Sequence, residues 1–541
     1  MNAAYDIDRS LERERIRTTA LHAIAAQIRH PLLFGPDNRP LPSSAYQYSR
    51  KASKREGTMQ NWNPRRIDHR TAARERHRIV ERATELIQDN PYAAGIKNTF
   101  GVTVVGAGLQ PHPVINAEAL GITKNAARAI QTEQRAIYTR WVPWSDAGER
   151  MHFGDIQYLM ECNLMQYGEV VVLPLMIDDP IRPYSLACQV ISPQRLRTPT
   201  DKAAGGNIRD GVELDRNGTP VAYWIKKTTI GTGRSFLADT SKNYSRIPVR
   251  KGHRWQVLHR FIQDDAEMVR NVPPYSPALK FFQDLNDLLD AELVSSIVTA
   301  AFSMFVELTS QDPYGFADNM PGFDGYGIDR NNNATDKTVR YQELIPGMIM
   351  YGNRGEKPHP IAASRPGTTF DPFTKIIMKA IAAALNIPYV VLFKDVEGTN
   401  FAGFRSAMLE AWRVFMFRRT WLGRNVLNPL WSMLMEEAYL RRELTVQAFY
   451  SNMHLYTQLE WRGAPKGDIE PIKAAQADKL LVQANLKTRA EAIAERGGDW
   501  RATFDQLEEE QDLMQEKGLT EKEIDDDTAS RWEKEENNDE K

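Results

Sequence analysis

The amino-acid sequence predicts a mixed α+β fold, and two observations lead to this prediction. Several long segments place apolar residues three and four positions apart, which is the spacing of an amphipathic helix. The middle of the chain instead contains short β-prone runs separated by turns. Residues 211–214 and 221–226 flank the turn Asp215-Arg216-Asn217-Gly218, and Asn-Gly between two such runs is a strong signal for a β-hairpin.

The first half of the chain is predicted to combine helices with buried strands. A helix over residues 68–88 ends at Asn90-Pro91, because the residue before a proline disfavours the helical backbone. We expect a β-prone segment over residues 100–109 to follow. The remaining predicted elements are helices over residues 126–141 and 155–166 and strands over residues 169–174 and 186–191.

A long helix is predicted over residues 277–307, with Ser276 as its cap and Pro277 in its first turn. Its length would be about 46 Å at 1.5 Å per residue. Three aspartates at i, i+3 and i+6 form an acidic stripe opposite a leucine face: Asp284, Asp287 and Asp290. Carboxylates at this spacing could bind a metal ion, but no histidine or further glutamate joins them at ligand spacing. A stripe that faces solvent or a channel is therefore favoured.

The second half begins with an irregular excursion over residues 310–336, which are rich in Gly, Pro, Asn and Asp. A helix over residues 373–385 is expected to begin after Asp371-Pro372 and to end before Pro388. The next segment, residues 394–403, is predicted to be a loop because its residues Gly398, Asn400 and Gly403 permit unusual backbone angles.

Helices are predicted over most of the remaining chain. Beyond residue 403 an apolar stripe with helical spacing indicates one face of a long helix, formed by Phe404, Met408, Ala411, Trp412 and Phe415. At Asn428-Pro429 this helix either kinks or gives way to a new one that runs to about residue 442. Residues 472–519 are predicted to form short helices joined by turns.

Composition and length exclude several classes of protein. The 541 residues correspond to three or four domain-sized units. The two cysteines, Cys162 and Cys188, allow at most one disulfide and no cysteine-rich zinc cluster. The charged N-terminus does not resemble an export signal. The most apolar stretches, residues 293–306 and 380–393, are shorter than the roughly 20 residues of a membrane-spanning helix, so no membrane insertion is expected.

The net charge of −1 conceals a strong asymmetry along the chain. Residues 508–541 carry 15 acidic and 5 basic residues, whereas the other 507 residues carry 64 basic and 55 acidic ones. Ten Lys and Arg residues lie within residues 50–78. They could neutralise phosphates, or form a solvated helix face or salt bridges to a neighbouring subunit. The tail beyond residue 520 has few apolar residues and is predicted to be disordered.

No motif in the sequence indicates catalysis. A Gly-Lys dipeptide is absent, so the chain has no Walker A loop. His-Glu-x-x-His and Gly-x-Ser-x-Gly are absent as well, and no cysteine has a patterned partner. The sequence therefore predicts neither an enzyme nor a cofactor or metal site.

Several of these segments resemble the lambda-type family of bacteriophage portal proteins, and the resemblance runs from about Trp62 to Leu519. The similar pieces occur in the order of the family. They are Asn90-Pro91-Tyr92-Ala93, the hairpin at residues 215–223, Val257-Leu258-His259-Arg260-Phe261, Arg270-Asn271-Val272-Pro273, residues 382–389, Asn400-Phe401-Ala402-Gly403-Phe404-Arg405, and Asp468-Ile469-Glu470-Pro471. This chain departs from the family at Ala402-Gly403, where serines are usual, and at Asn271, where glycine is expected.

The resemblance implies a portal-protein fold, in which subunits form a ring, generally of twelve, at one capsid vertex of the virion. The implied segments are an N-terminal arm (1–60), an α+β wing (61–275), a stem helix (276–307), a clip-like excursion (308–345), a return segment with a second stem helix (346–392), a tunnel loop (393–403), long wing helices (404–449), a helical crown (450–519) and an acidic tail (520–541).

The resemblance also implies partners. Double-stranded DNA would pass through the ring, and the terminase large subunit, head-tail adaptors, and major capsid and scaffold proteins would bind it, with assembly in the host cytoplasm. Candidate channel residues are Lys394, Gly398, Asn400, Arg405, Asp284, Asp287 and Asp290. Two rival classes are a DNA-acting enzyme, which would need a Walker loop or a metal-binding carboxylate cluster, and a ring-forming capsid or head-tail connector protein without DNA passage.

Overall fold

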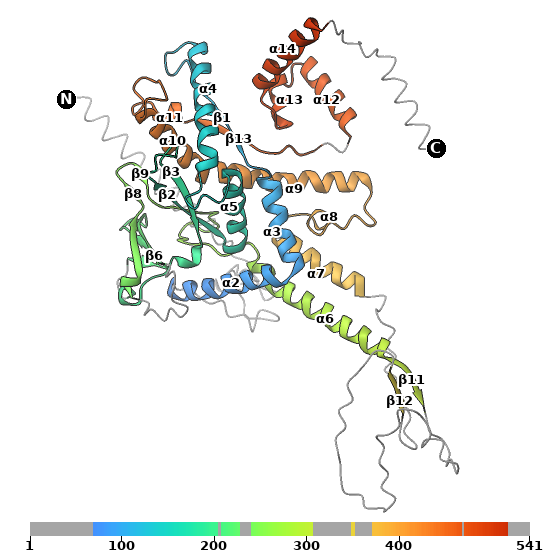
Figure 1. Cartoon of the computed structure of the whole chain (residues 1–541). Coiled ribbons are helices and arrows are strands. Elements are labelled where there is room, and N and C mark those ends of the chain that lie inside the picture. The colour runs from blue at the N-terminus through green and yellow to red at the C-terminus, as the bar shows by residue number, and fades with distance from the viewer. Residues whose placement is uncertain are drawn as a thin grey trace, which may run out of the picture. The chain divides into compact units, whose positions relative to one another are not determined.

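The computed structural model describes residues 69–203, 207–227, 240–306, 348–351, 370–467 and 470–517 (Figure 1). These residues form a mixture of helices and strands, which confirms the predicted α+β class. They belong to the compact unit His69–Lys541, which is distinct from Met1–Asp68. The predicted N-terminal arm (1–60), the clip-like excursion (308–345) and the acidic tail (520–541) lie outside the described residues. Among the described residues, no helix is both long and apolar enough to cross a membrane.

The predicted helix stop at Asn90-Pro91 is confirmed, but a second helix follows it at once. Helix α2 (His69–Asp89) is succeeded by α3 (Pro91–Val104), and the Asn90 side chain caps α3 by accepting hydrogen bonds from the backbone N–H groups of Tyr92 and Ala93. The prediction of a β-prone segment over residues 100–109 is therefore wrong. Phe100 is buried against Phe415, with ring centroids 5.3 Å apart, so tertiary packing outweighs the local β propensity.

Helices α4 (Lys124–Trp141) and α5 (Phe153–Tyr167) confirm the next two predictions. Most residues of α5 are buried, so this helix lies within the core and not at its edge as an amphipathic helix would. It ends at Gly168, whose φ of +78° is the left-handed conformation that glycine adopts easily. A Cβ atom at this position would lie 2.1 Å from the carbonyl oxygen of Val272, so the close approach of two backbones also requires glycine.

Two antiparallel sheets form the middle of the chain. The first contains β2 (Glu169–Met176) between β3 (Leu186–Ile191) and β10 (Leu258–Phe261). The second has the order β4 (Ile208–Arg209), β5 (Val212–Leu214), β6 (Pro220–Lys226) and β7 (Tyr244–Pro248). The predicted hairpin is β5–β6. The smaller strand pairs are β8 (Arg250–Lys251) with β9 (Arg254–Trp255), and β1 (Gln110–Pro113) with β13 (Leu459–Arg462).

Strand β2 is buried on both faces and separates two hydrophobic clusters. Val170 and Val172 belong to the large cluster formed mainly by helices, whereas Val171 and Leu173 pack with residues of the second sheet such as Tyr223. Successive side chains of a strand point to opposite faces, so the uninterrupted apolar run is what allows one strand to serve both clusters.

The long helix is shorter than predicted. A 3₁₀ turn (Ser276–Ala278) precedes α6 (Leu279–Ala301), and residues 302–306 form strand β11 (Phe302–Val306), which pairs in parallel with β12 (Met348–Tyr351). The predicted cap at Ser276 is also wrong, because its hydroxyl donates to the carbonyl of Pro273. The apolar run of residues 293–306 is compatible with a helix or a strand. Residues 302–306 form a strand because they pair with residues 348–351.

The second half is mainly helical. Its elements are α7 (Phe370–Ala384), α8 (Tyr389–Leu392), α9 (Phe401–Leu422), a π-helix (Gly423–Leu427), α10 (Asn428–Leu440), α11 (Met453–Tyr456), α12 (Pro471–Gln483), α13 (Arg489–Glu495) and α14 (Trp500–Glu516). Helix α7 begins before Asp371-Pro372, which lie in its first turn and do not precede it as predicted. At Asn428-Pro429 a new α-helix follows the π-helix, and Asn428 accepts a hydrogen bond from the indole of Trp461 instead of capping α10.

Candidate functional site

The predicted channel loop connects α8 to α9 and ends at Asn400, three residues earlier than predicted. The Asn400 side chain caps α9 by accepting a hydrogen bond from the backbone N–H of Gly403 at 2.8 Å, so residues 401–403 form the first turn of the helix. Lys394 and Gly398 have left-handed backbones, with φ of 56° and 69°. Of the three residues predicted to permit unusual backbone angles, Gly398 adopts one, whereas Asn400 is extended and Gly403 lies in the first turn of α9. Lys394, which was not among them, is also left-handed.

Carboxylates of the loop are held by a lysine of α7. The Lys375 ammonium lies 2.9 Å from Asp371, 3.7 Å from Glu397 and 4.0 Å from Asp395. Its hydrogen bond to Asp371 and these neighbouring carboxylates raise the Lys375 pKa. The Tyr389 hydroxyl donates to Asp395 and lowers the pKa of that carboxyl. The loop is therefore ordered by local polar contacts.

Lys394 and Arg405, the two basic residues among the channel candidates, differ in their surroundings. Lys394 is exposed, and no carboxylate in the described part of the chain lies within salt-bridge distance of it. Arg405 is exposed too, but its guanidinium lies 3.4 Å from the carboxylate of Glu470. Lys394 is consequently available to an anionic ligand without the loss of an existing ion pair, whereas Arg405 is not.

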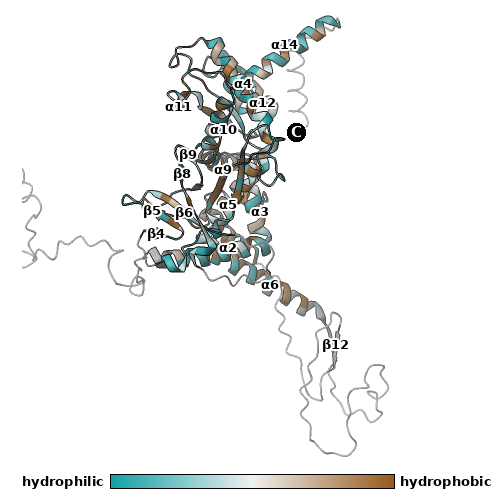
Figure 2. Cartoon of the chain, turned by 60° about the vertical axis from the view of Figure 1, so that its left-hand side comes forward, coloured by the Kyte–Doolittle hydropathy of each residue, from teal (hydrophilic) through white to brown (hydrophobic). Residues whose placement is uncertain are grey.

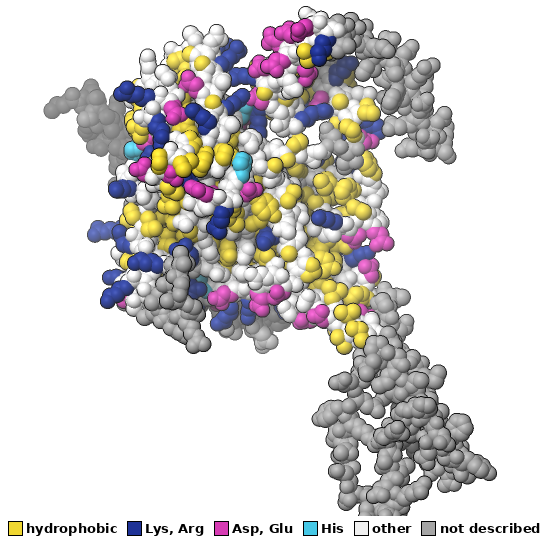
Figure 3. Space-filling view, in the orientation of Figure 1, with side chains coloured by type: hydrophobic (Ala, Val, Ile, Leu, Met, Phe, Trp, Pro, Cys, Tyr) yellow, Lys and Arg dark blue, Asp and Glu magenta, His cyan; other side chains and the backbone are white. Residues whose placement is uncertain are grey.

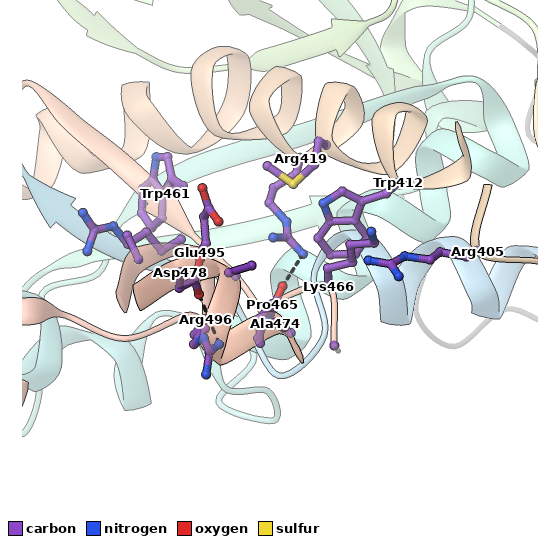
Figure 4. Close-up of a pocket in the computed structure, with 17 residues that line it drawn as sticks. Arg405, Trp412, Arg419, Trp461, Pro465, Lys466, Ala474, Asp478, Glu495 and Arg496 are labelled. Atoms are coloured by element: carbon purple, nitrogen blue, oxygen red, sulfur yellow. Dashed lines mark hydrogen bonds and ion pairs between the residues drawn. The ribbon is translucent and has the colours of Figure 1, made fainter. Parts of the chain in front are cut away.

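Arg405 lines a cavity of about 600 Å³ between α9 and the C-terminal helices (Figure 4). Arg419 and Trp412 approach it from α9, Asp478 from α12 and Glu495 from α13, and Arg496 directly follows α13. Arg419 donates to the carbonyl groups of Val104, Thr103 and Ala464, so its guanidinium ties three segments together. Five basic and two acidic side chains line the cavity, and most of these charges already have partners within the chain.

The acidic stripe is exposed on α6, as predicted. Gln283 donates to Asp287 at 2.8 Å and Asn286 donates to Asp290 at 3.4 Å, while Leu285 on the other face is buried. No group of three metal-ligating side chains occurs among the described residues. The polar contacts of the stripe stay within α6. Those of the loop go to Lys375 of α7 and Tyr389 of α8, and Arg405 of α9 pairs with Glu470. Within the described residues, no hydrogen bond or ion pair joins the two predicted groups.

A buried group of charged residues was missed by sequence reasoning. Glu169 at the start of β2 is fully buried, and its carboxylate accepts hydrogen bonds from Arg270, Arg76 and His259. Asp210 joins the group through Arg76 at 2.5 Å and His77 at 2.9 Å. We call these six residues the Glu169 cluster. Through its two carboxylates, Glu169 and Asp210, it joins α2, both sheets and the segment before α6.

Electrostatics in the Glu169 cluster favour charged carboxylates. Burial alone would raise the pKa of Glu169, but Arg270 and Arg76 lower it to about 2, and the pKa of Asp210 is lowered in the same way. Burial lowers the pKa of His259 despite its carboxylate neighbour. His259 and Arg270 lie in two of the segments that carry the family resemblance. The only local sign of the cluster is a glutamate at the head of an apolar run.

Comparison of the sequence with family models finds one family over most of the chain. Residues 55–419 match the family model of the phage portal protein, lambda family. The portal protein of Escherichia phage N15 is 22% identical over 500 residues, which cover 88% of this chain and 92% of that protein. Portal protein B of Escherichia phage lambda is 22% identical over 495 residues, covering 88% and 91%. A chain in the virion of a native gene transfer agent particle has a TM-score of 0.37 and 14% identity, covering 81% of this chain and 94% of that one.

Proposed function

We propose that this chain forms a ring of twelve copies at one capsid vertex. The chain belongs to the lambda family of phage portal proteins, and it is accordingly a structural protein and not an enzyme. Double-stranded DNA passes through the ring during genome packaging and ejection. The ring assembles in the host cytoplasm with major capsid and scaffold proteins. It then binds the terminase large subunit and later the head-tail adaptors. The observation that carries this proposal is the family match over residues 55–419.

The exposed apolar side chains of α6 and α7 support a ring. Leu293 and Val294 on α6 are 60% and 58% exposed, and Phe373 and Ile376 on α7 are 53% and 62% exposed. Hydrophobic side chains gather on this part of the surface in Figure 3, and Figure 2 shows brown turns along α6. Contiguous exposed apolar surface is typical of an interaction site. We assign α6 and α7 to a stem, residues 61–275 with 404–449 to a wing, and residues 450–519 to a crown.

The charges of the candidate residues suit a conduit for DNA. A protein that neutralises six to ten phosphates binds DNA tightly, with affinity that falls on the order of 10³ to 10⁵-fold between low and moderate salt. The aspartates of α6 instead repel the phosphate backbone if they face the channel. Lys394 makes transient phosphate contacts at the loop of residues 393–400, where Gly398 keeps the backbone free of side chain and Asn400 caps α9.

Substitutions at the loop test these roles. We expect Lys394→Ala to reduce the DNA packaged or retained by particles, and Lys394→Glu to reduce it further, because the second change adds repulsion to the lost attraction. Lys124→Ala, which removes an exposed lysine at the start of α4, serves as the matched control. Packaged DNA is measured as nuclease-resistant genome per particle. If Lys394→Ala and Arg405→Ala both leave packaging and retention unchanged, neither Lys394 of the loop nor Arg405 of α9 is a DNA contact.

The alternative is a ring-forming capsid or connector protein without DNA passage. Mass measurement of the assembled particle, combined with negative-stain imaging, separates it from the proposal. We expect a closed ring with a central hole. A monomer, or a closed assembly without a hole, would contradict the portal function and leave the family membership intact.

A further inference from the structure

The C-terminal helices α12, α13 and α14 contain no buried residue in the described chain. Several of their large apolar side chains are strongly exposed: Ile472 at 58%, Leu480 at 65%, and Leu486, in the turn after α12, at 76%. Most helical stability in proteins comes from packing an apolar face, so helices of 7 to 17 residues without such packing are marginal alone. These faces therefore need a covering surface.

Helix α14 presents a narrow apolar seam with acidic flanks. Trp500, Phe504, Leu507, Gln511 and Met514 follow one another at alternating spacings of four and three, which is the pattern of a coiled-coil seam, and all but Gln511 are apolar. Phe504 and Leu507 are 40% and 43% exposed. Glu508 and Glu510 flank this seam, and the whole helix has six acidic residues and one basic residue. Acidic side chains gather on α14 in Figure 3.

Helices α12 and α13 present the complementary chemistry. Residues 471–496 contain five basic and three acidic residues. Lys473, Lys479 and Arg489 are exposed, as are the apolar side chains Ile472 and Leu480 on α12. A surface of leucine and isoleucine bordered by lysines complements the seam of α14. The apolar side chains can pack on the seam, and the lysines can pair with the glutamates on either side of it.

We propose that α14 of one copy of this chain packs on α12 and α13 of the next copy. The proposal rests on the proposed ring. A ring is closed by an interface in which each copy contributes two different surfaces, and an acidic helix paired with a basic one meets this condition. Packing α14 against α14 would bring like charges together. The first turn of α14 is held within its own chain, because Asp499 lies 2.5 Å from Arg135 of α4.

Cysteine cross-linking between copies tests this interface in the full chain. Both natural cysteines, Cys162 and Cys188, are buried, so background linkage is low. One population carries Leu480→Cys and a second carries Leu507→Cys, and the two are co-expressed so that rings are mixed. After mild oxidation we expect covalent pairs of chains, because a disulfide requires Cα atoms roughly 4.4 to 6.8 Å apart. Pairing Leu480→Cys with Glu509→Cys, on the opposite side of α14, is the matched control.

Each outcome decides the proposal. Several-fold more linked pairs in the Leu480→Cys and Leu507→Cys mixture than in the Glu509→Cys control supports it. Linked pairs in rings that carry Leu507→Cys alone would show α14 against α14 and overturn it. Intact rings that stay unlinked would also overturn it but leave the portal function standing. An unsubstituted chain that forms no ring would overturn both.

Discussion

The Glu169 cluster and the loop of residues 393–400 both contain carboxylates paired with basic side chains, but their exposure differs. Glu169 and Arg270 are almost completely excluded from solvent, whereas Glu397 beside Lys375 is 85% exposed. A buried charge that loses its partner cannot be solvated, while an exposed one exchanges its partner for water at little cost. The charged residues of the Glu169 cluster are therefore needed for stability. Charged residues of the loop can instead be exchanged at little cost in stability.

Removal of Arg270 tests the buried half of this comparison and has the largest expected effect. Arg270→Ala leaves the Glu169 carboxylate without its main partner. It also removes the donor of the hydrogen bonds to the carbonyl groups of Leu196 and Pro193. We expect a loss of about 3 to 5 kcal/mol in the free energy of unfolding. Urea denaturation followed by circular dichroism measures it.

The matched control for Arg270→Ala is Arg246→Ala. Arg246 pairs with Glu213 at 2.8 Å, but its side chain is 45% exposed, so we expect a loss of about 1 kcal/mol or less. Equal losses for the two variants would mean that burial does not govern the strength of these pairs.

Acidification tests the same cluster with a smaller effect. The pKa of Glu169 falls from 4.5 to about 2 on folding, so its stabilisation is complete above pH 4.5 and is lost as the pH falls toward 2. Folding lowers the pKa of His259 below 6.5. Below pH 6.5 the unfolded chain therefore binds a proton at this histidine that the folded chain does not bind, and the free energy of unfolding begins to fall. Each group contributes a slope of at most about 1.4 kcal/mol per pH unit.

His259→Gln isolates the histidine contribution. Its amide can donate to Glu169 as the His259 Nε2–H does at 2.9 Å, but it does not titrate. We expect the denaturation midpoint of this variant to fall less than that of the unsubstituted chain between pH 6.5 and 5. Parallel curves over this range would contradict a neutral His259 in the folded state.

The cap of α9 gives the smallest expected effect and tests the exposed half of the comparison. Asn400→Ala removes the acceptor for the Gly403 N–H and should cost about 1 kcal/mol. Asn400→Asp keeps the cap and adds a negative charge. If Asn400→Ala reduces packaged DNA and Asn400→Asp restores it, Asn400 acts by positioning the loop; if both reduce it, the charge near the loop matters as well.

Local signals determined much of this fold from the sequence alone. The helix stop at Asn90-Pro91 and the hairpin at Asn217-Gly218 were predictable because proline and glycine act on their own backbone angles and those of neighbours. The left-handed backbone at Gly398 was predictable for the same reason. The acidic stripe on α6 was predictable because three aspartates that lie three residues apart fall on one face of a helix.

Only the tertiary structure decided features that depend on partners remote in the sequence. Residues 302–306 form a strand because residues 348–351 pair with them. Residues 100–104 are helical because Phe100 packs on Phe415. The Glu169 cluster joins Arg76 to Arg270, and Arg405 meets Glu470 only in the folded chain. A buried charge is stable only with its partners in place, and a residue's own sequence neighbours do not say which distant side chains will supply them.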